Sequence, residues 1–192
     1  MVIAIMPIPK EKERYTYKDY CGWPDEERWE IIDGVAYDMT PAPILRHQDI
    51  VLNLGGILKN ALKEKQCVVG IAPTDIVLSE HDVVQPDVYV VCDKTKITEK
   101  NIQGAPDLVV EILSPSTSQK DRWIKKELYE KYGVLEYLII DLDGEYIERY
   151  LLGNNGEFNQ GEAFDVEGVM QLKSLSGLEI SVGDVFSKSI GM

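Results

Sequence analysis

Short hydrophobic runs, each five to eight positions long, follow one another along most of the chain and predict β-strands. Nearer the start, Asp33-Gly34 separates two apolar stretches within 29–39, which is the signature of a two-residue β-hairpin turn. The sequence therefore predicts a protein rich in strands, and the main strand segments are 67–72, 75–79, 87–93, 107–113, 136–143 and 146–152.

Two other segments carry the period of a helix. Apolar residues recur at intervals of three and four over 44–65, which predicts a long helix with one buried face. A second helix is predicted over 121–133, with Ile124, Leu128 and Tyr132 along its apolar stripe. Both helices are expected to pack against the strands.

The second helix lies between the strands at 107–113 and 136–143. Such a strand–helix–strand unit normally forms a right-handed parallel crossover. The residues over 151–186 are rich in turns and predict antiparallel edge strands with a terminal cap. Together these elements predict an α/β fold with a mixed sheet.

Carboxylates interrupt two of the predicted strands. Side chains alternate along a strand, so Asp107 and Glu111 share a face with apolar neighbours. Asp87 opens the strand that precedes them, and adjacent strands would bring Asp87 within a few ångströms of Glu111. Two carboxylates that close require a cation or a shared proton between them. Asp107 is expected to make turn hydrogen bonds rather than bind a metal.

The spacing of Asp87 and Glu111 resembles the PD-(D/E)xK motif of nucleases. The surrounding segments resemble the Uma2 family (formerly DUF820) of restriction-endonuclease-like proteins over roughly residues 15–185; they are "WEIIDG", "RHQ", "VVQPDVYVV", "GAPDLVVEILSPST" and "DRWIKKELYEKYGVLEYLIID".

This resemblance implies a restriction-endonuclease-like core: a central mixed β-sheet flanked by helices, with additional antiparallel strands. It implies one domain over 1–192, with 1–14 as an N-terminal extension. It further implies that Asp87, Glu111 and the Ile112 carbonyl hold Mg²⁺ or Mn²⁺, a ligand set that suits these ions.

One position departs from the motif, because Leu113 stands where the motif has its lysine. Lys125 on the following helix is the candidate replacement, and it shares a helical face with Asp121 and Tyr129. The neighbouring Lys126 is the alternative. If no lysine reaches the carboxylates, the motif loses the group that orients water or stabilises developing negative charge.

Two further residues are expected to support the site. The resemblance implies an acidic role for Glu30, which lies in "WEIIDG". His47 lies on the apolar stripe of the first long helix and should face the sheet. A histidine there would bind phosphate or assist proton transfer. The alternative for each is an ordinary structural residue.

Charge and cysteine content restrict the classes of function. The net charge of -13 argues against a protein that coats nucleic acid through lysine and arginine. Cys21, Cys67 and Cys92 are widely spaced and odd in number, so free thiols in a reducing compartment are expected, with Cys67 and Cys92 packed as small apolar groups. No apolar stretch approaches the ~20 residues of a membrane span. A cytoplasmic location is expected.

The leading hypothesis is a Mg²⁺- or Mn²⁺-dependent endonuclease acting on nucleic acid, with DNA favoured over RNA. Because many nucleases of this superfamily dimerise to cut both strands, a homodimer is a further expectation. The alternative is a catalytically inactive nuclease-fold module for binding or assembly, which Leu113 and the acidic charge favour. A small-molecule phosphohydrolase is a weaker third hypothesis, because no phosphate-cradling glycine loop is present.

Overall fold

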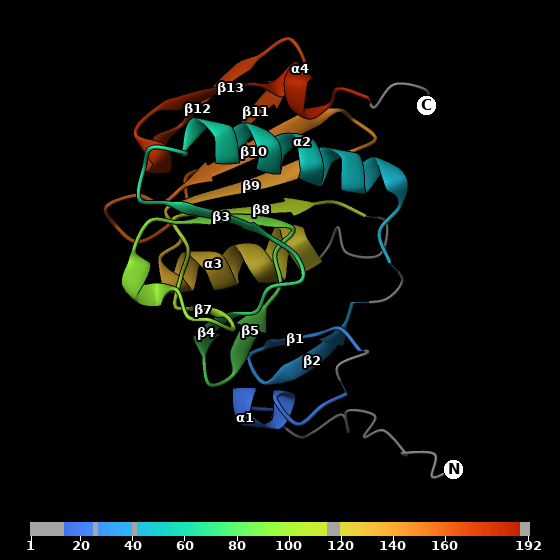
Figure 1. Cartoon of the computed structure of the whole chain (residues 1–192), viewed down its shortest axis with the longest axis vertical. Helices are drawn as coiled ribbons and strands as arrows, with labels where there is room; N and C mark the ends of the chain where they lie inside the picture. The colour runs from blue at the N-terminus through green and yellow to red at the C-terminus, as the bar shows by residue number, and fades with distance from the viewer. Residues whose placement is uncertain (1–13, 25–26, 40–41, 115–119, 189–192) are drawn as a thin grey trace.

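The computed structural model describes residues 14–24, 27–39, 42–114 and 120–188 (Figure 1). The expected N-terminal extension, 1–14, lies outside these ranges except for its last residue. A six-stranded sheet forms the centre of the molecule, in the order β11-β10-β9-β8-β6-β3. The bounds of its strands are Val68–Ile71 (β3), Val88–Val91 (β6), Leu108–Ile112 (β8), Glu136–Asp141 (β9), Tyr146–Leu151 (β10) and Glu162–Asp165 (β11).

This sheet is mixed, as predicted. Strands β8 and β9 run parallel and are joined through the helix between them, whereas every other neighbouring pair in this sheet is antiparallel. Helix α2 (Leu45–Ala61) covers one face and helix α3 (Lys126–Tyr132) covers the other (Figure 1). The β8–β9 crossover therefore places α3 directly against the strand that carries Glu111.

Side-chain alternation along β8 divides the core as the sequence predicts. Leu108, Val110 and Ile112 pack into the core beneath α2. Val109 and Leu113 pack into a second core on the α3 side. Glu111 shares that second face, so its carboxylate lies under α3.

A second, five-stranded sheet has the order β2-β1-β5-β4-β7 and lies beyond α3 in Figure 1. Asp33 and Gly34 have φ of 49° and 77°, the left-handed conformation of a tight hairpin turn, which confirms the predicted β1–β2 hairpin. Strands β5 and β7 were not predicted because each is only two or three residues long. The bounds are Trp29–Ile32 (β1), Val35–Asp38 (β2), Ile76–Ser79 (β4), Asp82–Val84 (β5) and Ile102–Gln103 (β7).

Short elements close the two ends of the molecule. Near the N-terminus, α1 (Tyr17–Tyr20) packs aromatic side chains on Ile31, Val77 and Val83 of the five-stranded sheet. At the other end, a separate two-stranded ribbon is followed by a short helix that covers the core beneath α2. These last elements are β12 (Val169–Leu172), β13 (Leu178–Ser181) and α4 (Val182–Val185), and two 3-10 turns lie at Lys94–Lys96 and Lys173–Leu175.

The second predicted helix is not a regular α-helix. Its first part, η2 (Lys120–Lys125), is a π-helix, and α3 continues from it to Gly133, whose φ of 79° ends the helix. The predicted stripe is wrong for Ile124, which is 38% exposed. The wider turn of a π-helix shifts Ile124 off the stripe and turns the side chain of Lys125 inward.

The cysteine prediction is also wrong. Cys67 and Cys92 form a disulfide, with Cα atoms 3.9 Å apart, and only Cys21 remains a free thiol among the described residues. The cause is sheet register: Val68 pairs with Val91 in the antiparallel β3–β6 ladder, so the residues just outside that pair face each other. Sequence spacing alone does not reveal this register.

We expect a Cys67→Ser, Cys92→Ser double variant to unfold with a free energy about 3 kcal/mol lower than the oxidised wild type. The bond joins residues with a sequence separation of 25. A crosslink over a loop of that length restricts the conformations of the unfolded chain, which stabilises the folded protein by about this amount. Urea unfolding with and without reductant measures it. Cys21→Ser, at an exposed position, is the matched control. Equal stability of double variant and oxidised wild type would contradict the expectation.

Candidate active site

Asp87 and Glu111 lie across from each other on neighbouring strands. In the β6–β8 ladder Val88 pairs with Val110, so the next pair in the same register is Asp87 with Glu111. Asp87 Oδ2 accepts a hydrogen bond of 2.8 Å from the Ile112 N–H. The register thus brings together the two acidic residues and the main chain of Ile112, the three positions predicted from sequence to hold a metal.

Lys125 reaches this pair from the end of the π-helix. Its Nζ lies 2.8 Å from Glu111 Oε1, 2.8 Å from Glu30 Oε1 and 3.8 Å from Asp121 Oδ1. The lysine is 2% exposed, so these contacts lie in the interior. Lys126 lies elsewhere, with its Nζ 4.2 Å from the centre of the Tyr150 ring. Of the two candidate lysines, the geometry therefore brings only Lys125 to the carboxylates.

Burial and charge work against each other in this cluster. Burial raises the pKa of Glu111 to about 8, and the Lys125 charge only partly offsets it. Burial alone would lower the pKa of Lys125, but the surrounding carboxylates hold it well above its ordinary value. One lysine thus faces three buried carboxyl groups, those of Glu30, Glu111 and Asp121. Asp121, Asp87 and Glu30 each raise the pKa of Glu111 further, and proton uptake by Glu111 or a bound divalent cation would reduce this repulsion.

Tyrosine and glutamine groups fix the carboxylates in place. The Tyr129 hydroxyl donates a 2.7 Å hydrogen bond to Glu111 Oε1, and burial raises its pKa well above the ordinary value. The Gln85 N–H donates a 3.0 Å hydrogen bond to Glu30 Oε1. Gln85 was not expected from the sequence, because its contact with Glu30 is made by its main-chain N–H and no side-chain pattern marks it.

His47 is linked to Asp87 rather than to Glu111. It lies in the first turn of α2, is 6% exposed, and its Nε2 is 3.2 Å from Asp87 Oδ2. Asp107 is also placed: its Oδ2 accepts a 2.7 Å hydrogen bond from the Cys92 N–H on the neighbouring strand. His47 is thus in contact with one of the two paired acidic residues. Asp107 lies outside the pair and accepts a hydrogen bond from a main-chain N–H.

The donor set fits a hard divalent cation at Asp87 and Glu111. Within the described residues, each carboxylate makes its side-chain hydrogen bonds through one oxygen, Asp87 Oδ2 and Glu111 Oε1, which leaves the second oxygen for a cation. The same part of the chain holds no group of three His, Cys, Asp or Glu side chains arranged around a metal position. Two carboxylates completed by main-chain oxygen and water suit Mg²⁺ or Mn²⁺, which bind few protein side chains.

A mixed α/β sheet with acidic groups on adjacent strands, and a lysine from the crossover helix, defines a restriction-endonuclease-like class of protein. The fold agrees with the crystal structure of "a putative nuclease belonging to DUF820" from Anabaena variabilis, at a TM-score of 0.74 and 23% identity, over 89% of this chain and 97% of that one. The family model Uma2, described as "Putative restriction endonuclease", matches residues 15–183. The chain belongs to the Uma2 family.

A curated relative extends this comparison. "Uncharacterized protein slr1290" of Synechocystis sp. is 28% identical over 184 residues, which is 94% of this chain and 93% of the relative. In the described ranges, the helices are all too short or too polar to cross a membrane.

Proposed function

We propose that this protein is a Mg²⁺- or Mn²⁺-dependent endonuclease that hydrolyses phosphodiester bonds of nucleic acid, with DNA as the favoured substrate. The observation that carries the proposal is the pairing of Asp87 with Glu111 across β6 and β8, with Lys125 held against Glu111. A single acidic residue in a strand would be unremarkable, but this set combines metal ligands with a cation able to act on water.

Asp87, Glu111 and the Ile112 carbonyl would hold the ion. When bound, it supplies a Lewis acid for the phosphate and lowers the pKa of a water molecule. Lys125 holds a proton on Nζ beside Glu111 and so can orient the attacking water or stabilise negative charge developing on the phosphate. This placement would let Lys125 take over the role of the motif lysine that Leu113 replaces.

The remaining residues would position these groups. Glu30 Oε1 forms an ion pair with Lys125 and accepts a hydrogen bond from the Gln85 N–H. These two contacts would hold the Lys125 side chain in its orientation toward Glu111. Tyr129 holds Glu111 Oε1, and His47 holds Asp87 Oδ2 or meets a phosphate oxygen. Water is excluded from one side, because Lys125 and Glu111 lie in the interior.

The competing proposal is an inactive nuclease-fold module. It is favoured by one observation: Lys125 already forms ion pairs with two carboxylates, so the cluster has a cation of its own. The pairing of Asp87 with Glu111 favours the enzyme instead, because a scaffold gains nothing from keeping two acidic residues side by side. A wild-type protein that binds no divalent cation would therefore support the inactive module. A wild-type protein that binds one would support the enzyme.

Addition of Mn²⁺ is expected to raise the melting temperature of the wild type by about 5–10 °C at 100 times the dissociation constant, because the ion binds only the folded chain. Asp87→Asn should abolish the shift. Asp107→Asn, which alters an acidic residue outside the cluster, is the matched control and should keep it. Differential scanning fluorimetry measures all three. A wild type that is indifferent to Mn²⁺ and Mg²⁺ would reject the metal site.

The proposal includes a cytoplasmic location, where nucleic acid is accessible, and a homodimer, which would place two sites against two strands. The Cys67–Cys92 bond bears against the first of these, since the cytosol usually keeps thiols reduced. Thiol titration of protein isolated under alkylating conditions tests the location, and analytical ultracentrifugation tests the dimer.

A further inference from the structure

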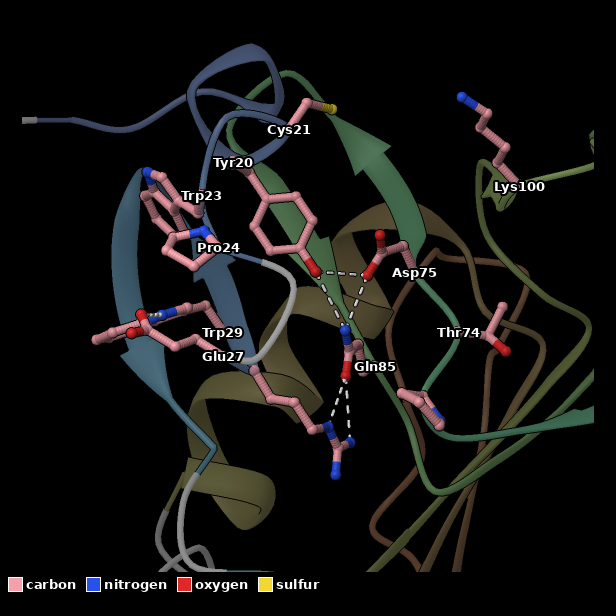
Figure 2. Close-up of a pocket in the computed structure, with 12 residues that line it drawn as sticks. Tyr20, Cys21, Trp23, Pro24, Glu27, Trp29, Thr74, Asp75, Gln85 and Lys100 are labelled. Carbon is pink, nitrogen blue, oxygen red and sulfur yellow. Dashed lines mark hydrogen bonds between the residues drawn. The ribbon is translucent and has the colours of Figure 1, made fainter. Parts of the chain in front are cut away.

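A pocket separate from the carboxylate cluster lies between the first strand and the β4–β5 region, with a cavity volume of about 580 Å³. This is within the range of small-molecule sites in proteins. Figure 2 shows Tyr20, Asp75 and Gln85 converging at its centre, with Trp23 and Trp29 on one side and Lys100 on the other. The metal hypothesis uses none of these side chains.

One wall of the pocket is aromatic. The rings of Trp23 and Trp29 meet edge to face with centres 5.7 Å apart, and Tyr20 lies 5.6 Å from Trp23 in a similar arrangement. All three side chains are only partly buried, so ring surface remains open to the cavity. Aromatic rings of this kind form stacking platforms for nucleobases.

The centre of the pocket presents hydrogen-bonding groups held in fixed positions (Figure 2). Asp75 Oδ1 accepts from the Tyr20 hydroxyl at 2.7 Å and from Gln85 Nε2 at 2.9 Å. Arg28 donates through Nε and Nη2 to Gln85 Oε1 at 3.2 and 3.1 Å. Within the described residues, Asp75 Oδ2 and Arg28 Nη1 take no part in this network. One acceptor and one donor are therefore preorganised and available to a ligand.

Gln85 connects this pocket to the carboxylate cluster. Its side chain belongs to the pocket network, whereas its N–H donates to Glu30, which contacts Lys125. Gln85 is also two residues before Asp87, and two residues of chain span at most about 7 Å. The pocket and Asp87 therefore adjoin the same short segment of chain, 85–87.

From this juxtaposition we infer that the pocket is a nucleobase subsite of the proposed nuclease. In this subsite, a base next to the hydrolysed bond stacks on Trp23 and Trp29. Its exocyclic amino group donates a hydrogen bond to Asp75 Oδ2. Adenine, cytosine and guanine carry such an amino group and thymine does not. The inference rests on the proposed function, and it adds a preference among substrates that the metal site alone would lack.

The test is equilibrium binding of fluorescein-labelled hexamers of deoxyadenosine, deoxycytidine and deoxythymidine in EDTA, where hydrolysis is blocked. The adenine and cytosine hexamers should bind about 10-fold more tightly than the thymine hexamer, the discrimination typical of one specific base contact. Asp75→Asn keeps the shape of the side chain but replaces one acceptor with a donor. It should remove the preference.

Intrinsic tryptophan fluorescence gives a second readout. The chain has three tryptophans, of which Trp23 and Trp29 line the pocket and Trp123 does not. Unlabelled adenine hexamer should quench the tryptophan fluorescence of the wild type and of Trp123→Phe to the same extent. It should quench the fluorescence of Trp23→Phe less. Thermal melting of each variant separates a local effect from loss of the fold.

Parallel cleavage assays with Mn²⁺ distinguish the two proposals. Equal binding of all three hexamers, together with cleavage that Glu111→Gln abolishes, would reject the subsite and keep the nuclease. Base-selective binding that Asp75→Asn removes, without cleavage of any substrate, would reject the nuclease and leave a nucleotide-binding pocket. Quenching that depends on Trp123 alone would also overturn the subsite.

Discussion

Replacing Lys125 with methionine is expected to lower the free energy of unfolding by about 3–5 kcal/mol above pH 8, where Glu111 is ionised. Methionine fills similar space but removes the cation that contacts Glu30 and Glu111, and leaving buried charge without its partner has a cost of that size. Urea unfolding in EDTA measures the change. Lys126→Met, one residue along the chain, should change stability far less because that lysine is only partly buried.

The pH dependence identifies the cause. Burial raises the pKa of Glu111 from 4.5 to about 8, so the folded protein binds a proton there that the unfolded chain releases. The stability of metal-free wild type should therefore decrease as pH rises from about 4.5 to 8, with a slope of up to about 1.4 kcal/mol per pH unit. The Lys125→Met penalty should shrink in acid. A penalty that is the same at pH 5 and pH 8 would indicate lost packing rather than lost charge compensation.

The second large effect concerns catalysis. Glu111→Gln is expected to reduce Mn²⁺-dependent cleavage of labelled nucleic acid by at least about 100-fold, because the amide keeps the shape but weakens a metal ligand. Single- and double-stranded DNA and RNA should be compared, with DNA the favoured substrate. Lys125→Ala should also lose activity if this lysine acts on the water.

Asp107→Asn is the control for that assay, since Asp107 lies on the same chain segment but bonds the Cys92 N–H. It should retain activity close to wild type. Cleavage that survives in Glu111→Gln would point to another site or to a contaminating nuclease. A wild type that binds Mn²⁺ and cleaves none of the four substrates would favour the inactive module.

Patterns with a local cause were predictable from the sequence. The Asp33-Gly34 turn requires positive φ, and the alternation around Glu111 follows from strand geometry, so both appear in the chain itself. The pairing of Asp87 with Glu111 depends also on the register of β6 against β8, and it was expected because the family resemblance places both residues in one motif. The family resemblance supplied the fold class, and the structural comparison confirms it.

Features that depend on register between distant segments were not predictable. The Cys67–Cys92 bond exists because β3 and β6 pair in one register out of several. The pocket beside Gln85 joins residues from the N-terminal region and from the β4–β5 region, and no local pattern marks that meeting. The crossover helix was expected to be a regular α-helix, and its π-helical first part places Ile124 at the surface instead.

The π-helix makes the site depend on the number of residues in η2 more than on their identity. Trp123 and Ile124 are 68% and 38% exposed, so most substitutions there should be tolerated. Removing either residue is different, since each residue turns an α-helix by about 100°. A one-residue deletion would restore regular helical winding and swing Lys125 away from Glu111. Among homologous chains, the length of this segment would then separate those that keep the buried lysine from those that have lost it.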